Sequence, residues 1–535
     1  MGAPDVEVDA LEAVLSSAAR RQDVMEQEAA VDGPGDILRA AAVRFGDAVA
    51  LVTASRTLTF VELDAASDKV AAALAGRGVR RGQTVSIYAQ NSWQWVTSYH
   101  GALKAGAVVN PVNVMLTPEE LAFVLRDCDA AAVFTGGDHA AGVVELTRDL
   151  PHLHSVVSFG EAVAGADAFD ELLAADGPSP DVTPDPDEPC TIGYTSGTTG
   201  HPKGAVQSQR AVLLNCALTA TMHGRTQRDV VVTALPAPHV YGNVAINGTL
   251  MAGGTVVLME RFAPAEALRL IGEHHATMFE GVPAMYATML ADPALAVADL
   301  SSLTRCTVGG QTIPVSTIER WQDRSGAPLL ELWGMTEISG LGTTHAVHAP
   351  PVPGSIGVSL PGVEIRIADL EDISRDVAVG EPGELMIRGP IVMMGYYGNP
   401  EATAEVLEPD GWLHTGDVAL RDPTGHLFVV DRRKHMIITG GYNIYPDEIE
   451  RVLAGHSAVA MVAAGPVPDD VRGELACAYV VLAHGAAATE ADLIAFAGEH
   501  LATYKRPRMV RFVDDLPKTS TGKIMRRELI NTHHS

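Results

Sequence analysis

The sequence predicts an α/β protein with a large N-terminal domain and a small α+β C-terminal domain. The large domain is expected to hold two parallel-sheet α/β subdomains and a small β-barrel-like unit. Three observations predict this architecture: strands and helices alternate over most of the chain, the pattern changes near residue 352, and a fresh αβ pattern follows residue 431. Repeated strand–helix alternation is typical of parallel sheets with helices packed outside them.

Length and charge narrow the class of protein. With 535 residues the chain is too long for one compact core, so at least two domains are expected. The formal net charge is −28, from 38 basic and 66 acidic side chains. This balance argues against nucleic acid or an anionic membrane as the main partner. It leaves room for an anionic ligand bound by a few local cations and backbone N–H groups.

The five cysteines are scattered without a CxxC pair, which favours a reducing compartment. No window approaches the roughly 20 apolar residues of a membrane helix, so no integral membrane segment is expected. The first thirty residues lack the basic and apolar regions of a signal peptide. These observations predict a cytoplasmic protein.

The first elements can be taken in chain order. Residues 1–35 are predicted to be an acidic extension. Strands are expected at 85–88 and 107–110, and a helix at 93–104. The next helix has a well-marked start, because Thr117, Pro118 and Glu120 form a capping box with proline at the first helical position.

Two composition changes mark boundaries further along. The Pro/Asp-rich stretch 177–189 is predicted to be a solvated connector, after which the alternation resumes. Short alternating runs between turns over 352–430 indicate the small antiparallel or barrel-like unit. The charged cluster that begins at Asp431 separates this unit from the last αβ segment. The predicted domains are therefore 36–431 and 432–535.

The most informative segment is the glycine-rich string from Tyr194 to Gly204, which follows a predicted strand at 190–194. Small residues let the backbone turn its N–H groups inward to form an anion nest. Lys203 adds a positive charge. The loop residues expected to bind a polyphosphate are Thr195, Ser196, Gly197, Thr198, Thr199, Gly200 and Lys203.

Two common nucleotide loops are excluded by the spacing. No Gly-x-x-x-x-Gly-Lys-Ser/Thr string aligns here, which disfavours a P-loop kinase, and no Gly-x-Gly-x-x-Gly string is present. The ordered string 195–204 instead resembles the phosphate-binding signature of the adenylate-forming (AMP-binding) superfamily, and acyl-CoA synthetases within it. Further motifs follow in that family's order, so the resemblance spans about residues 36–530.

Two of these motifs resemble the nucleoside site. In 331–337, the resemblance implies that Trp333, Gly334 and Met335 bind adenine, that Thr336 contacts the α-phosphate and that Glu337 holds Mg²⁺, a cation that prefers oxygen ligands. In 410–417, Asp417 would accept hydrogen bonds from the ribose hydroxyl groups.

The other three motifs resemble the moving parts of the family. Arg432 would bind the ribose or phosphate, and Lys434 would be the hinge about which a mobile C-terminal domain rotates. Gly440 and Gly441 resemble the wall of the tunnel for the thiol arm. Lys523 resembles the catalytic lysine that bridges the carboxylate and the α-phosphate.

Segments resembling the acyl pocket include 236–243 and 309–311. His239 resembles the gate on the carboxylate side, and Gly310 and Gln311 follow on the next segment. Pro238 stands where a large aromatic residue is common, and Gln311 where a small residue is usual. Because a buried amide is costly without a partner, we hypothesise that the acid carries a polar group or that the channel is short.

The resemblance implies an acid:CoA ligase, with ATP, Mg²⁺ and coenzyme A as cofactors and a small-molecule carboxylic acid as substrate. Transfer to a carrier-protein thiol, an amine or another nucleophile is the alternative. A binding module without turnover is a third interpretation, disfavoured by the set Lys203, Glu337, Asp417, Arg432 and Lys523. A homodimer is left open.

Overall fold

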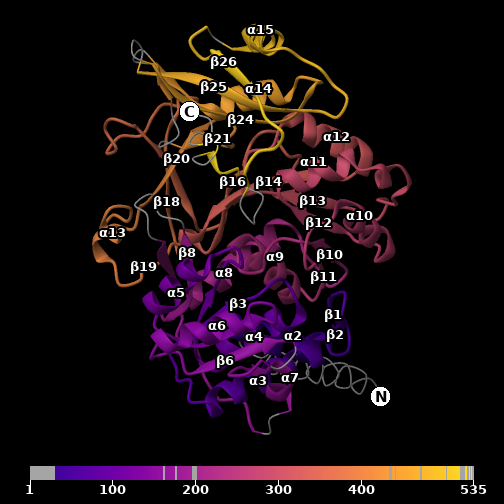
Figure 1. The fold of residues 1–535 in the computed structure, drawn as a ribbon, viewed down its shortest axis with the longest axis vertical. Helices are drawn as coiled ribbons and strands as arrows, with labels where there is room; N and C mark the ends of the chain where they lie inside the picture. Colours follow the sequence, from indigo (N-terminus) through magenta and orange to yellow (C-terminus); the bar gives the residue numbers. More distant parts are fainter. Residues whose placement is uncertain are drawn as a thin grey trace, which may run out of the picture.

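The computed structural model describes residues 31–160, 163–174, 177–195, 202–432, 437–439, 442–469, 473–501, 503–518, 524–526, 529 and 532. Residues 1–30 of the predicted acidic extension lie outside this part. The C-terminal strands and helices form one end of the molecule, and the larger N-terminal part forms the rest (Figure 1).

An eight-stranded sheet has the order β19-β9-β8-β4-β3-β5-β6-β7. Its pairs are parallel from β8 through β7, and β9 and β19 add an antiparallel edge. The strands are β3 (Thr84–Tyr88), β4 (Val108–Pro111), β5 (Ala130–Gly136), β6 (Ser155–Phe159), β7 (Asp167–Ala168), β8 (Pro189–Thr195), β9 (Lys203–Ser208) and β19 (Gly395–Tyr396).

A nine-stranded sheet has the order β16-β15-β14-β13-β12-β10-β11-β1-β2. It is parallel from β14 through β1, with antiparallel strands at both edges. The strands are β1 (Val49–Val52), β2 (Thr57–Thr59), β10 (Val230–Thr233), β11 (Thr255–Leu258), β12 (Met278–Gly281), β13 (Arg305–Val308), β14 (Leu329–Met335), β15 (Gly340–Thr344) and β16 (Val358–Ser359).

A layer of helices joins the two sheets. Helix α4 packs on β3 and β4, helix α9 packs on β11 and β15, and α2 contacts both α3 and α9. The helices of the large domain are α2 (Ile37–Phe45), α3 (Phe60–Gly76), α4 (Trp93–Lys104), α5 (Pro118–Asp127), α6 (Ala140–Leu146), α7 (Phe169–Leu173), α8 (Gln209–Met222), α9 (Val240–Met251), α10 (Pro264–Glu273), α11 (Pro283–Ala291), α12 (Val315–Ser325) and α13 (Pro400–Ala404). Short 3₁₀ helices add η1 (Pro34–Asp36), η2 (Thr147–Asp149), η3 (Pro293–Val297) and η4 (Thr336–Ile338).

The predicted small unit is a four-stranded antiparallel sheet of order β17-β18-β20-β21. Its strands are β17 (Glu364–Ala368), β18 (Gly383–Arg388), β20 (Leu413–Arg421) and β21 (Leu427–Arg432). The fold class predicted for the large domain is therefore confirmed: two mostly parallel sheets with helices, and an open antiparallel sheet in place of a closed barrel.

The C-terminal domain has its own sheet and its own core. The sheet contains β22 (Ile437–Thr439), β23 (Tyr442–Ile444), β24 (Val459–Asp469), β25 (Gly473–Leu482) and β26 (Met509–Phe512), and the helices are α14 (Pro446–Ala454) and α15 (Glu490–His500). Buried Ile449, Leu453 and Leu493 of the helices pack with strand residues in one cluster. A separate core is what allows such a unit to fold as a domain of its own.

Local sequence signals explain several boundaries. Thr117 accepts a hydrogen bond from the N–H of Glu120, whose Oε2 in turn accepts one from the N–H of Thr117, so the predicted capping box is present. The helix predicted at 93–104 is α4, and Pro118 and Pro446 each open a helix. The described residues of the connector at 177–189 contain no helix or strand before β8 begins at Pro189.

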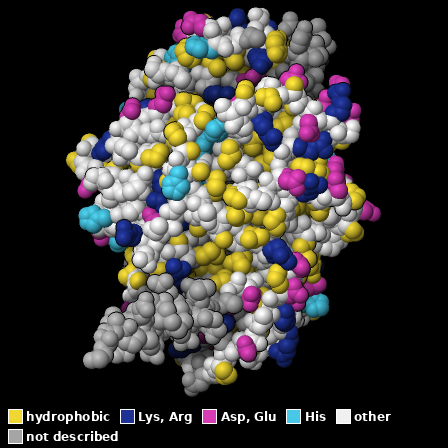
Figure 2. Space-filling model, turned by 180° about the vertical axis from the view of Figure 1, so that it is seen from behind, with side chains coloured by type: hydrophobic (Ala, Val, Ile, Leu, Met, Phe, Trp, Pro, Cys, Tyr) yellow, Lys and Arg dark blue, Asp and Glu magenta, His cyan; other side chains and the backbone are white. Residues whose placement is uncertain are grey.

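On the surface seen in Figure 2, basic and acidic side chains are interspersed. That face offers no continuous basic stripe, among the described residues, of the kind that tracks a nucleic acid backbone. None of the described helices combines the length and apolarity needed to cross a membrane.

Candidate active site

One cavity of about 1440 Å³ opens at the carboxyl ends of the parallel strands. Its lining includes the segments that directly follow β10, β12, β13 and β14 in one sheet, and in the other the segment that follows β4 and the last residues of β8. Ligands of open α/β sheets bind at this edge, because the loops that leave the strands converge there. The volume exceeds that of a typical site for one small ligand, so the cavity has room for a nucleotide and a second group.

The cavity brings together predicted residues that lie far apart in the chain. Those that line it are Thr195, Lys203, His239, Gly310, Gln311, Trp333, Gly334, Met335, Thr336, Glu337 and Asp417. Other predicted residues lie outside the described part: Ser196, Gly197, Thr198, Thr199, Gly200, Lys434, Gly440, Gly441 and Lys523. For Arg432, only the backbone is described, and it pairs with Asp417 across β20 and β21.

Strands β8 and β9 hold the two ends of the glycine-rich loop. They form an antiparallel pair in which Thr195 lies opposite Lys203. The Lys203 ammonium group lies 5.3 Å from the centre of the Tyr396 ring and 3.6 Å from the exposed Glu405 carboxylate. Because that carboxylate is exposed to solvent, it offsets little of the charge that the largely buried lysine presents to the cavity.

Glu337 lies in the short helix η4, directly after β14, and its side chain is buried. The Tyr396 hydroxyl donates to Glu337 Oε1 at 3.0 Å, and Thr195 Oγ1 lies 3.5 Å from the same oxygen. Burial raises the pKa of Tyr396, so its hydroxyl stays protonated and remains a donor. Both of these contacts of the carboxylate, among the described residues, are with neutral hydroxyl groups at the cavity wall.

A side chain of strand β9 holds helix η4 in place. Gln207 Nε2 donates to the main-chain oxygen of Thr336 at 2.8 Å, and Thr191 donates to the amide oxygen of Gln207. Gly193 on β8 allows the close approach, since a Cβ there would lie 2.5 Å from the Thr336 methyl group. Neither Gln207 nor Tyr396 was predicted, because both are distant in the chain from the motif they support.

Trp333 and Asp417 form a buried pair at the nucleoside end. The indole Nε1 donates to Asp417 Oδ2 at 2.7 Å, and both side chains are buried. This bond fixes the Asp417 carboxylate at the cavity wall and also fixes the plane of the indole ring. The two motifs predicted to share one nucleoside thus meet directly.

The turn between β14 and β15 depends on a glycine. A Cβ at Gly334 would lie 2.0 Å from the main-chain oxygen of Gly340, closer than real atoms approach. After the neighbouring strand β13, Gly310 has φ +89°, a region that favours glycine. At both positions the main chain itself lines the cavity, because glycine has no side chain.

His239 also lines the cavity. It is the N-cap of α9, and its Nδ1 accepts a hydrogen bond from the Tyr241 N–H at 3.3 Å. The cap fixes the imidazole beside the first turn of α9, which also lines the cavity. Pro238 and Gln311, the two departures from the family pattern, line it as well.

Glu331 was not singled out from the sequence. It lies on the cavity wall, is buried, and accepts a hydrogen bond from the Gly354 N–H at 2.7 Å. Burial raises the pKa of its carboxyl group to about 8, although the Gly354 N–H and the positive charge of Arg451 oppose this shift. A signal was present in the sequence: Glu331 is two residues before Trp333 on β14, and alternate strand residues share a face.

The C-terminal domain contributes to the same cavity through α14. Asp447, Glu450 and Arg451 line it, together with Lys518 and Arg526. Thr312 of the large domain donates to Asp447 Oδ2 at 3.3 Å, which joins the two domains. Arg526 pairs with Asp447 and, at 2.8 Å, with Glu450. These ion pairs hold the segment after the predicted catalytic lysine against α14.

Comparisons with known proteins agree with this geometry. Residues 38–397 match the AMP-binding enzyme family, and residues 448–523 match the AMP-binding enzyme C-terminal domain. The chain is 33% identical to a long-chain-fatty-acid–CoA ligase of Bacillus subtilis, over 93% of this chain and 95% of that protein. It is 38% identical to a feruloyl-CoA synthase of an Amycolatopsis species, over 88% of this chain and 93% of the relative.

Solved structures of related enzymes have the same fold as this chain. An anthranilate CoA ligase in complex with anthranoyl-AMP superposes with a TM-score of 0.88 at 28% identity, covering 94% of this chain and 97% of that one. An amide bond synthetase from Marinactinospora thermotolerans superposes with a TM-score of 0.84 at 29% identity, covering 94% of this chain and 100% of its own. The chain therefore belongs to the AMP-binding enzyme family, and its fold is that of the acid–CoA ligases.

Proposed function

We propose that this cavity joins a carboxylic acid to coenzyme A with consumption of ATP. The chain is an AMP-forming acid–CoA ligase: a carboxylate attacks the α-phosphorus of ATP, pyrophosphate leaves, and the thiol of coenzyme A then displaces AMP from the acyl-AMP. One observation carries the proposal. A single cavity is lined by Lys203 and Glu337 beside the ends of the glycine-rich loop, by the hydrogen-bonded pair Trp333 and Asp417, and by His239 at the start of α9.

The first half-reaction needs positioning and charge neutralisation more than a general base, because the attacking carboxylate is already anionic. We assign the loop donors Thr195, Ser196, Thr198 and Thr199, the loop glycines Gly197 and Gly200, and Lys203 to the β- and γ-phosphates. Lys523 bridges the acid and the α-phosphate. The largely buried ammonium group of Lys203 supports its part of this assignment.

Glu337 would hold the magnesium ion. The chemistry of the donor fits, because the buried carboxylate lines the cavity and accepts hydrogen bonds from hydroxyl groups in the described part of the chain. Mg²⁺ is commonly bound by one or two carboxylates together with substrate phosphates. No group of three or more metal-ligating side chains occurs among the described residues, which agrees with a site completed by the nucleotide. When bound, the ion neutralises charge on the leaving pyrophosphate.

We assign the adenosine part to Trp333, Gly334, Met335, Asp417 and Arg432, and the α-phosphate to Thr336. The direct bond between the indole and the Asp417 carboxylate supports a common task for the two motifs. In this assignment Asp417 accepts hydrogen bonds from ribose hydroxyl groups, while the Trp333 N–H keeps the carboxylate oriented.

The second half-reaction is assigned to a rotated C-terminal domain. Gly440 and Gly441 line the path of the thiol arm, and Lys434 is the hinge, with the domain boundary between residues 431 and 432. Separate cores in the two parts of the chain support a rigid rotation about this boundary.

At the acid end, His239 is assigned to the carboxylate side of the substrate, and Gly310 and Gln311 to the opposite wall. We propose an acid that carries a polar group. The support is the position of Gln311 on the cavity wall, where a polar group of the ligand can satisfy its amide. Higher turnover with long unsubstituted fatty acids than with hydroxy or keto acids of similar size would contradict this proposal.

A different acceptor is the second candidate function. The likeness to an amide bond synthetase over nearly the whole chain favours it. A release assay with coenzyme A, a carrier protein and simple amines, each added to enzyme that has formed acyl-AMP, would separate the two. Product with an amine but none with coenzyme A would replace the main proposal.

The direct test of activation is ATP–pyrophosphate exchange with the full chain and a panel of acids. We expect acid-dependent exchange of label into ATP. Absence of exchange with every acid would favour a binding module over an enzyme.

Two further proposals concern the setting of the enzyme. The five cysteines are all buried and free, which supports a cytoplasmic location. Homodimer formation stays a prediction, and light scattering of the full chain would test it.

A further inference from the structure

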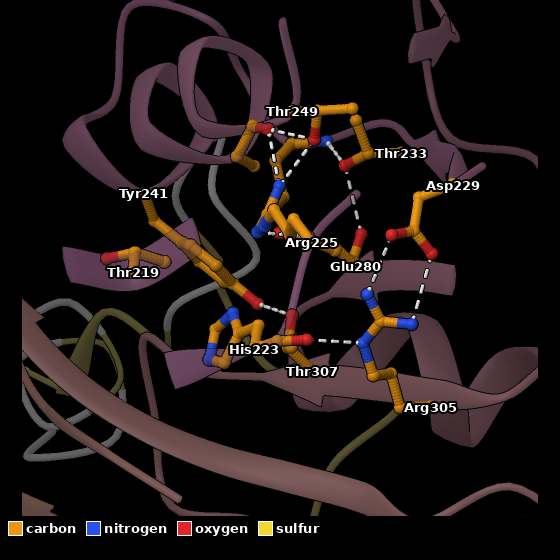
Figure 3. Close-up of polar contacts among 12 residues, drawn as sticks. Thr219, His223, Arg225, Asp229, Thr233, Tyr241, Thr249, Glu280, Arg305 and Thr307 are labelled. Atoms are coloured by element: carbon orange, nitrogen blue, oxygen red, sulfur yellow. Dashed lines mark hydrogen bonds and ion pairs between the residues drawn. The ribbon is translucent and has the colours of Figure 1, made fainter. Parts of the chain in front are cut away.

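A fully buried ion pair lies outside the cavity, between helix α9 and strand β12. Arg225, in the turn between α8 and β10, donates through Nη2 to Glu280 Oε1 on β12 at 2.5 Å (Figure 3). Both side chains have 0% exposure. Neither residue lines the cavity. Removing two charges from water is costly, and a buried pair of this kind often adds nothing to stability compared with apolar side chains of similar volume.

Arg225 fixes helix α9. Its Nη1 donates to the Ala245 main-chain oxygen at 2.7 Å and to Thr249 Oγ1 at 2.5 Å, and both acceptors lie on α9. The first turn of this helix forms one wall of the cavity, through Val240 and Tyr241. The guanidinium group therefore sets the position of a wall that it does not itself touch.

Glu280 lies on the strand that leads into a second wall of the cavity. Strand β12 ends one residue after it, and the chain continues through Val282 into helix α11, whose cavity face is small: Ala284, Ala287, Thr288 and Ala291. Tyr286 of α11 donates to the main-chain oxygens of Phe279 at 3.1 Å and Thr307 at 2.7 Å. Helix α11 is thereby seated on β12, which carries Glu280, and on β13 beside it.

A second hydrogen bond connects helix α9 to the sheet on which helix α11 packs. The hydroxyl groups of Tyr241 and Thr307 lie 2.7 Å apart (Figure 3). Thr307 is on β13, next to β12 in the sheet, and lies opposite Glu280 in the register. Helix α9 is thus tied to β12 and β13 at two places, by Arg225 near its middle and by Tyr241 in its first turn.

The pair is not arranged for stability alone. Arg225 Nε and Glu280 Oε2 are buried without a hydrogen-bond partner in the described part of the chain. Buried polar atoms that lack a partner are destabilising. A hydrogen-bonded ion pair has a preferred distance and direction, so it sets the spacing between the two elements that it joins. Apolar side chains of the same volume set this spacing less precisely.

We propose that Arg225 and Glu280 are positioning residues that set the distance between α9 and α11, and so select acids by their width. The inference rests on the proposed function only in placing the acid between these two helices. Neither residue lines the cavity, so each acts on the substrate only through the position of its helix.

The experiment compares acid selectivity in wild type, Glu280→Gln and the double variant Arg225→Met/Glu280→Leu. Pyrophosphate exchange is measured for each with straight-chain, branched and ring acids of matched carbon number. The double variant replaces the pair by apolar side chains of similar volume, which preserves stability without the charge geometry. We expect the ratio of kcat/KM between ring and straight-chain acids to change by roughly tenfold in both variants, with KM for ATP unchanged.

The matched control is Asp229→Asn. Asp229 pairs with Arg305 in the neighbouring buried ion pair, at 3.0 Å, and neither residue lines the cavity (Figure 3). The control should lower the melting temperature and leave the acid ratio unchanged. If the double variant, at near wild-type melting temperature, kept the wild-type acid ratio, or if all acids lost activity equally, the proposal would be wrong. Absence of exchange in the wild type itself would instead contradict the proposed function.

Discussion

At the scale of single residues, two buried carboxylates of the site accept hydrogen bonds from neutral donors. Glu337 receives hydroxyl donors and Asp417 receives an indole N–H, so neither carboxylate is neutralised by these contacts. Both side chains also line the cavity, where a ligand can reach them. This is the arrangement expected where a protein must bind a cation or a polyol and release it in every cycle.

The first prediction concerns Glu337. Glu337→Gln keeps the shape and the hydrogen bond from Tyr396 but removes the charge, so we expect acid-dependent pyrophosphate exchange to fall by about 10²–10³-fold. The control is Glu405→Gln, an exposed carboxylate 3.6 Å from Lys203, which should change the rate little. Equal losses in the two variants would mean that the general negative charge of the region matters, and not the position of Glu337.

The second prediction uses the raised pKa of Glu331. Its folded pKa is about 8 and its ordinary value is 4.5, so the folded protein binds more protons than the unfolded chain between these values. The free energy of unfolding therefore falls as pH rises through this window, by up to about 1.4 kcal/mol per pH unit from this group. Glu331→Gln removes the effect. Relative to wild type, the variant should gain stability as the pH rises from about 5 to about 8 in urea titrations, and parallel profiles would contradict this.

At the scale of elements, short-range and long-range features differ in how well the sequence predicts them. The capping box of α5, the strand before the glycine-rich loop and helix α4 were all predicted, because each depends on residues that are close in the sequence. The sequence did not predict Gln207 under Thr336 or Arg225 beside Glu280. These partners are separated by 129 and 55 residues, and only the packing of whole elements brings them together.

The third prediction compares two glycines with opposite surroundings. Gly334→Ala would place a Cβ 2.0 Å from the Gly340 oxygen, so the β14–β15 turn cannot close and both stability and exchange activity should fall strongly. Gly142 lies exposed within α6, and nothing lies within 4 Å of the position that a Cβ would take there. Gly142→Ala should therefore stabilise the protein by about 0.5–1 kcal/mol. Thermal unfolding of both variants tests the pair, and similar melting temperatures would contradict the clash at Gly334.

At the scale of the whole molecule, one cavity is shared by two domains that have separate cores. Helix α14 lines part of the cavity, and Asp447 of this helix meets the large domain through a 3.3 Å hydrogen bond from Thr312. A long hydrogen bond of this kind is easily broken and remade. A small domain joined in this way to the site suits an enzyme in which two reactions use the same pocket in turn.

The fourth prediction separates those two reactions. Lys523 and the pair Gly440–Gly441 lie outside the described residues, and both roles follow from the proposed rotation of the C-terminal domain. Lys523→Ala should cripple formation of acyl-AMP, measured by pyrophosphate exchange, by about 10²–10³-fold. It should still convert supplied acyl-AMP and coenzyme A to thioester, because thiol attack does not need the ATP-bridging ammonium group.

Gly441→Leu is the complementary variant. A bulky side chain would block the path of the thiol arm, so thioester formation from supplied acyl-AMP should fall while pyrophosphate exchange stays near wild type. Lys505→Ala is a matched control for the first variant, since Lys505 lies in the C-terminal domain, pairs with Glu448 and does not line the cavity, so both half-reactions should stay active. Equal loss of both steps in Lys523→Ala and Gly441→Leu would contradict two conformations. A single arrangement of the domains would then have to serve adenylation and thiol transfer together.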